Sequence, residues 1–163
     1  MKDSYLSREE LVKFIATLPT RRLAAGAVIR NEHGELLLVQ PNYKDGWILP
    51  GGTVEAGEAP KPGCFREVEE ELGLRLAPGR LLLVFHGLAR GVWGDSTYYM
   101  YDAGVIAKNT PVTLQTEELI TYEWVAPEQL QEYVNPGFAE RLHDCLRALR
   151  TGEVVEVSSD ERP

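Results

Sequence analysis

The stretch from residue 51 to residue 74, GGTVEAGEAPKPGCFREVEEELGL, constrains the chain more than any other. It joins a glycine-rich loop to a segment in which Glu67, Glu70 and Glu71 recur at helical spacing. At that spacing the three carboxylates share one face of a helix, while apolar residues on the other side can be buried. Gly73 suits the left-handed cap that ends many helices. The stretch therefore predicts a short helix that presents a cluster of acids.

This acidic face is unfavourable for an isolated helix. Like charges one turn apart cost roughly a few tenths of a kcal/mol per pair, and the C-terminal end of a helix disfavours negative charge. A divalent cation would reverse both effects, and carboxylate oxygens without cysteine or histidine suit hard ions such as Mg²⁺ or Mn²⁺ rather than zinc. The alternative interpretation is a solvated amphipathic helix with surplus glutamate.

The same residues match a known motif at every defined position. From Gly52 to Leu74 the chain reads G-x5-E-x7-R-E-U-x-E-E-x-G-U, where U is apolar, and this pattern resembles the Nudix box. The resemblance is to the Nudix hydrolase family, with weaker similarity from about Leu23 to Leu130. It implies an α/β (α+β) fold in which a mixed sheet lies between helices, an α/β/α sandwich.

The resemblance also implies a set of metal ligands. Glu67, Glu70 and Glu71 are expected to bind Mg²⁺, for which Mn²⁺ can substitute, together with the carbonyl oxygen of Gly52. A glycine suits that position because a Cβ would intrude between the backbone and the metal. Glu58, on the loop, is implied to be a supporting residue rather than a direct ligand.

The role of Arg66 and the identity of the general base each have alternative interpretations. By resemblance, Arg66 orients the catalytic glutamate, and the alternative is a surface ion pair with Glu70 one turn away. Glu67 is the first candidate for the general base. Family members do not all take the base from the box, so Glu117 and Glu118, which precede a short strand, are further candidates; a solvated turn is the alternative for both.

Composition limits the other classes of function. The 163 residues fit one domain, and a net charge of −8 argues against nonspecific nucleic-acid binding. The two cysteines form no disulfide framework, which fits a reducing cytosol; a buried inert thiol is expected at Cys64. No apolar run is long enough to span a membrane. A cytoplasmic protein without membrane association is expected.

The chain divides into three parts on pattern. Residues 1–20 are expected to form a helical extension, with a capping box from Ser7 to Glu10, and residues 151–163 a flexible tail. Residues 21–150 are expected to form the Nudix domain. Strands are expected at 23–30, 35–40, 81–88, 96–107 and 122–125, and helices in the motif and at 126–133 and 137–150.

The implied reaction is hydrolysis of a nucleoside diphosphate linked to another group, X, with water attacking phosphorus. A nucleoside triphosphate, canonical or oxidised, is expected first and a nucleotide sugar second. The alternatives are an inactive Nudix-like module that senses a nucleotide and a metal-stabilised structural domain. A homodimer is compatible with the family. Candidate substrate-binding residues are Arg30, Lys44, Trp47 and Arg90.

Overall fold

The computed structural model describes residues 5–159, and within them seven strands form one mixed sheet in the order β6-β2-β1-β5-β4-β7, with β3 paired to β1. The β1–β5 and β4–β7 pairs are parallel and the other pairs are antiparallel. The prediction of a mixed sheet is confirmed. The strands are β1 (Arg22–Arg30), β2 (Leu36–Pro41), β3 (Gly51–Thr53), β4 (Leu81–Gly87), β5 (Ser96–Val105), β6 (Leu119–Val125) and β7 (Val155–Ser158).

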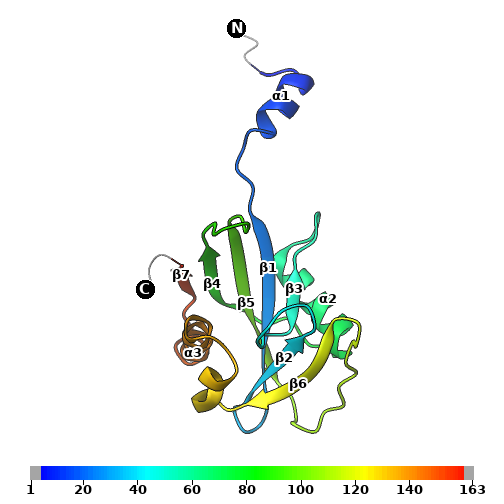
Figure 1. The fold of residues 1–163 in the computed structure, drawn as a ribbon, viewed down its shortest axis with the longest axis vertical. Helices are drawn as coiled ribbons and strands as arrows, with labels where there is room; N and C mark the ends of the chain where they lie inside the picture. Colours follow the sequence, from blue (N-terminus) through cyan, green and yellow to red (C-terminus); the bar gives the residue numbers. More distant parts are fainter. Residues whose placement is uncertain (1–4, 160–163) are drawn as a thin grey trace.

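Helices flank this sheet, as Figure 1 shows. The motif helix α2 (Pro60–Leu72) begins with proline at its first turn and ends at Gly73, which has the left-handed φ of 66° expected of a cap. Helix α3 (Pro136–Thr151) is capped by the Asn135 side chain. The segment expected as a helix at 126–133 is instead a 3-10 helix, η1 (Pro127–Glu132).

Alternation along the central strands gives the sheet two buried faces. In β1, Val28 belongs to the apolar cluster under α3, whereas Ala27 and Ile29 belong to the cluster under α2. Because both faces are covered, β1 and β2 read as nearly continuous apolar runs. Phe65 and Val68 pack α2 against its face of the sheet. This packing fixes the rotation of the helix and leaves its acidic side at β3, where Glu67 contacts Gly52 and Glu71 binds the Gly51 N–H.

Strand β3 brings the start of the motif into the sheet beside β1. It pairs antiparallel with Ala24, Ala25 and Gly26 of β1, on the edge of β1 that β2 meets only at Arg30. Gly51 has a φ of 145°, and a Cβ there would lie 2.0 Å from the carbonyl oxygen of Ala25. Only glycine allows the two strands to approach so closely.

The N-terminal helix α1 (Arg8–Ile15) stands apart from the sheet (Figure 1) and has no buried residue. Its capping box is confirmed: the Ser7 side chain accepts from the Glu10 N–H, and the Glu10 carboxylate accepts from the Ser7 N–H at 2.8 Å.

The prediction of a flexible tail after residue 150 was wrong for its central part. Residues Val155–Ser158 form β7, which pairs with β4, and Val157 is buried. The alternation of valine with polar residues in VEVS is a strand signal that the interpretation as a tail overlooked. The last residues of that predicted tail, 160–163, lie outside the described residues.

Among the helices of the described residues, none combines the length and the apolar character needed to cross a lipid bilayer.

Candidate active site

The acidic face of α2 lies against strand β3 at the start of the motif. Glu67 contacts Gly52 so closely that a Cβ on this glycine would lie 2.8 Å from the carboxyl carbon of Glu67. Glu67 is partly buried, Glu70 is exposed and Glu71 is buried. The structure therefore brings the predicted ligands to one end of β3, and their side chains differ in how far they are buried.

Glu71 is the most buried of these acids, with 3% of its surface exposed. One of its carboxylate oxygens accepts a hydrogen bond from the Gly51 N–H at 2.9 Å. Burial raises the pKa of Glu71 to about 7, against the effect of that hydrogen bond and together with repulsion from Glu67, Glu118 and Glu70. Such a carboxylate is poised to accept a cation, which would relieve both the desolvation and the repulsion.

Arg66 connects the acids of the loop with those of the helix. It forks onto Glu58 with two hydrogen bonds, at 3.1 Å and 2.7 Å. Its third nitrogen donates to both Glu67 and Glu70, at 3.1 Å each. The predicted contact with Glu67 and its alternative, the ion pair with Glu70, are therefore both present.

Glu58 is held in place by this fork. The Arg66 guanidinium, followed by the Glu55 N–H, lowers the pKa of Glu58 to about 2, so this carboxylate is ionised at any ordinary pH. Gly63 makes room for it, because a Cβ there would lie 2.6 Å from a Glu58 oxygen.

At Glu67, effects that raise the pKa of the carboxyl group are partly offset by one that lowers it. Burial raises its pKa, the Arg66 guanidinium opposes that shift, and repulsion from Glu70 and Glu118 adds to it. Its carboxylate is thus oriented by a cation while its proton affinity stays above the ordinary value, a combination compatible with a general base.

The segment before β6 brings a further acid toward the motif. The Gln115 N–H donates to the Glu71 carbonyl at 2.9 Å, and the Asn42 N–H donates to the Glu118 carbonyl at 2.8 Å. Placed in this way, Glu118 raises the pKa of both Glu67 and Glu71. For Glu117 the structure shows a backbone contact: its carbonyl oxygen accepts from the Asn42 side chain at 2.7 Å.

Tyr43 is a further neighbour of the acidic face. Its pKa is raised, first by burial of the hydroxyl and then by the carboxylates of Glu71, Glu118 and Glu67, although 65% of the residue surface is exposed. An aromatic residue in the polar loop directly before the motif was the available sequence signal.

The four candidate substrate-binding residues do not come together. Arg30 pairs with Asp102 at 3.1 Å, and Trp47 packs edge-on against Tyr133 at the α3 side of the core. Lys44 lies over the Tyr43 ring, beside the acidic face. Arg90 is in the exposed loop between β4 and β5, bridged to Trp93. Their roles in substrate binding stay predictions.

The acidic residues suit a divalent ion by chemistry, because all the side-chain donors are carboxylate oxygens. As the side chains stand, no three Asp, Glu, His or Cys residues within 5–159 surround a common point. The reason is visible in the contacts: Arg66 holds Glu67 and Glu70, and the Gly51 N–H holds Glu71. Rotation of these side chains would have to accompany metal binding.

Cys64 is buried on α2, and burial raises the pKa of its thiol to about 12. The expected inert thiol is consistent with this environment, because the thiolate is the reactive form.

Comparison with known proteins agrees with the motif. The family model of the NUDIX domain matches residues 20–147. A MutT-like protein of Streptomyces ambofaciens is 28% identical over 78% of this chain and 79% of its own length. Nudix hydrolase 5 of Arabidopsis thaliana is 33% identical over 90% of this chain, which spans 54% of that protein. The crystal structure of a MutT protein from Methanosarcina mazei Go1 superposes with a TM-score of 0.67 at 28% identity, covering 84% of this chain and 99% of that one.

Proposed function

The chain belongs to the Nudix hydrolase family, and on that premise we propose that it hydrolyses a diphosphate bond in a nucleoside diphosphate linked to a further group X. The observation that carries the proposal is the arrangement of Arg66 and its carboxylates. One guanidinium holds Glu58, Glu67 and Glu70 at once, which orders acidic side chains that would otherwise repel one another.

Enzymes of this family generally use divalent metal ions, and Mg²⁺ is the ion proposed here. Glu67, Glu70 and Glu71, with the carbonyl oxygen of Gly52, would hold it. Bound there, the ion would neutralise the phosphate oxygens on which negative charge develops during the reaction. The net charge of −8 makes this necessary, because a phosphorylated substrate is otherwise repelled by the protein.

The remaining task is to remove a proton from the attacking water. Glu67 is the first candidate for this base, because Arg66 orients its carboxylate and burial raises its pKa. Glu118 is the better supported candidate outside the motif, since it acts on the pKa of both Glu67 and Glu71. A nucleoside triphosphate is the first candidate substrate and a nucleotide sugar the second.

A phosphate-release screen with Mg²⁺ tests the proposal. The panel contains canonical and oxidised nucleoside triphosphates, nucleotide sugars, ADP-ribose and dinucleotides. Glu70→Gln is the test variant, and Glu69→Gln is its matched control, because Glu69 lies on the same helix but pairs with Arg75 outside the cluster. We expect hydrolysis to fall at least about 100-fold in the first variant and to remain near wild type in the second.

Equal activity of wild type and Glu70→Gln at saturating Mg²⁺ would refute the ligand assignment. No hydrolysis of any compound, with Mg²⁺ still bound, would favour the nucleotide-sensing alternative.

A further inference from the structure

Helix α1 carries an apolar surface that the rest of its own chain leaves exposed. Leu11, Phe14, Ile15 and Leu18 recur at intervals of three and four residues, so they form one stripe along α1 and the turn that follows it. Each of the four is between 44% and 54% exposed. A helix as short as α1 is marginally stable in water by itself and depends on burial of its apolar side. This α1 stripe is therefore incomplete without a covering surface.

A second exposed apolar surface lies at the end of the sheet from which α1 departs. Leu88, Val92 and Trp93, in the loop between β4 and β5, are 44%, 96% and 65% exposed and together make up the loop patch. The loop is tied to the start of β1, because the Arg22 N–H donates to the Asp95 carbonyl at 3.1 Å and the Arg22 guanidinium lies over the Trp93 ring. Figure 1 shows α1 beyond the same end of the sheet. The α1 stripe and the loop patch thus belong to one end of the molecule.

The linker between α1 and β1 holds the helix away from the loop patch of its own chain. Arg21 pairs with Asp95 at 3.6 Å, which anchors the chain at the sheet just after the linker. Between this anchor and α1, Pro19 fixes its own φ and disfavours a helical turn at the residue before it. In Figure 1 the linker leads away from β1, and α1 stands clear of the loop between β4 and β5.

A two-fold axis at this end of the molecule covers both surfaces at once. It places α1 of each copy at the loop patch of the other, because the helix and the patch lie at the same end. Such a contact is isologous, since each copy uses each surface once, and the resulting dimer is closed.

The exposed area agrees with this exchange. Large side chains bury about 150–250 Å² each, so at these exposures the α1 stripe offers roughly 400 Å² per copy and the loop patch about the same. Reciprocal packing in two copies would bury about 1,600 Å², the usual size of a specific interface between proteins. Pairing of the two α1 stripes with each other would bury only about 800 Å², as in weak crystal contacts.

The charges of the two surfaces are complementary. The end of the molecule with the loop patch carries three arginines and one aspartate, namely Arg21, Arg22, Arg90 and Asp95. Glu9 and Glu10 lie in the first turn of α1 and are exposed. An acidic helix start that faces a basic surface favours this pairing over others.

A membrane surface is a poorer cover for the α1 stripe. Helices that lie on membranes are rich in lysine and arginine on their polar side, whereas α1 has two acidic and two basic residues.

We propose that the chain forms a two-fold homodimer in which the α1 stripe of each copy packs against the loop patch of the other. Dimer formation is independent of diphosphate hydrolysis, so its test needs no substrate.

Sedimentation analysis of the full chain, from low micromolar to several hundred micromolar, measures the oligomeric state. The test variants are Phe14→Ser on the α1 stripe and Trp93→Ser on the loop patch. Val154→Ser is the matched control, because Val154 is 53% exposed but precedes β7, away from the end of β4 that leads into the loop patch.

Wild type is expected to sediment as a dimer, and each test variant to raise the Kd of the dimer about 10- to 100-fold. Val154→Ser should behave as wild type. A wild-type protein that stays monomeric at the highest concentration would overturn the proposal. So would a dimer that Phe14→Ser dissociates and Trp93→Ser leaves intact, because the helices would then pair without the loop patch.

Cross-linking identifies the contact itself. Chains with Ile15→Cys are mixed with chains that carry Val92→Cys and treated with a short thiol-specific cross-linker; the natural Cys64 and Cys145 are buried. A product that joins one chain of each kind supports the exchange. The absence of that product, or a link within one chain when both substitutions are combined in it, contradicts the exchange; the second result would place α1 on its own loop patch.

Discussion

Glu71→Gln is expected to stabilise the protein when divalent ions are removed. The buried carboxylate has its pKa raised from 4.5 to about 7. Each pKa unit corresponds to about 1.4 kcal/mol, so its ionisation costs the folded state roughly 3 to 4 kcal/mol. Glutamine avoids this cost, and its side-chain oxygen can still accept the Gly51 N–H. The variant that should abolish metal binding is therefore expected to fold more tightly than wild type.

The pH dependence gives this prediction its direction. A carboxyl group with a raised pKa in the folded state favours folding most below its unfolded pKa, near 4.5, and that contribution is lost as pH rises to about 7. The advantage of Glu71→Gln over wild type should consequently be small near pH 5 and reach its full size near pH 8.

Urea unfolding in a chelator, at about pH 5 and about pH 8, measures the difference directly. Glu69→Gln serves as the control, because Glu69 is exposed and should show no such pH-dependent gain. A Glu71→Gln protein that is less stable than wild type at pH 8, or whose advantage does not change with pH, would refute the reasoning that desolvation dominates at this site. Added Mg²⁺ should stabilise wild type and leave the variant unchanged.

Three further changes test other contacts. Gly52→Ala places a Cβ 2.8 Å from the Glu67 carboxyl carbon, so steady-state assays should show kcat lowered about 10- to 100-fold in a folded protein; unchanged kcat would show that the position of Glu67 is not critical. Arg66→Gln removes the guanidinium that holds the pKa of Glu58 at about 2. In urea titrations wild type should be the more stable protein at neutral pH, and its advantage should vanish as pH falls toward 2. A difference in stability that does not change with pH would contradict the ion-pair account. Val157→Asp buries a charge in β7 and should lower the free energy of unfolding by about 2 kcal/mol or more, a loss that a detached tail would not show.

Local patterns predicted the parts of the site that lie within one element. Glu67, Glu70 and Glu71 share a helix face because helical periodicity is set by the backbone, and Gly73 ends α2 because a left-handed residue is needed there. The resemblance of the same stretch to the Nudix box supplied the family and the α/β/α arrangement.

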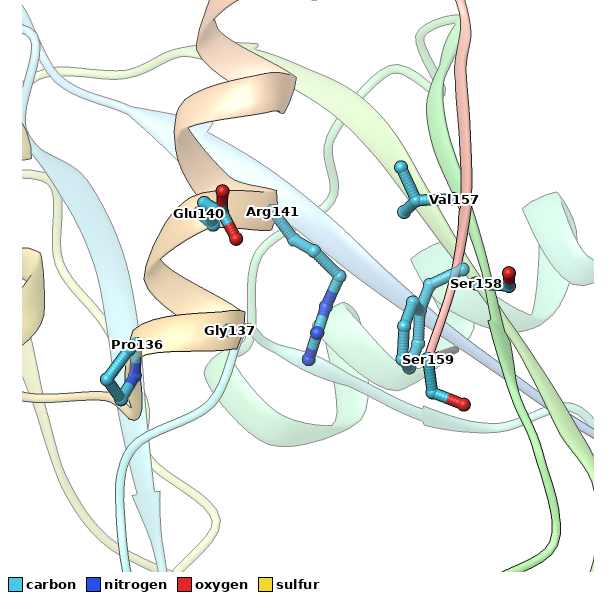
Figure 2. Close-up of a pocket in the computed structure, with 8 residues that line it drawn as sticks. Pro136, Gly137, Glu140, Arg141, Val157, Ser158 and Ser159 are labelled. Atoms are coloured by element: carbon cyan, nitrogen blue, oxygen red, sulfur yellow. The ribbon is translucent and has the colours of Figure 1, made fainter. Parts of the chain in front are cut away.

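Contacts between segments that are distant in the sequence could not be predicted from such local patterns. Sequence spacing did not show that Glu118, rather than Glu117, would act on the motif carboxylates. The path of the segment before β6 depends on its hydrogen bonds to α2 and to Asn42, which follows β2. The cavity lined by Phe85, Arg141 and Val157 (Figure 2) likewise exists only because β7 adds to β4 and α3 packs over both.

The sequence by itself determined which acids share a face of α2, and the tertiary structure decided how each of them behaves. Glu70 remains in water, whereas Glu71 is buried and bound to the Gly51 N–H, although the two are adjacent in the chain. The physical reason is that helical spacing depends on neighbouring residues alone, while desolvation and its effect on pKa depend on what the rest of the fold places around each carboxylate.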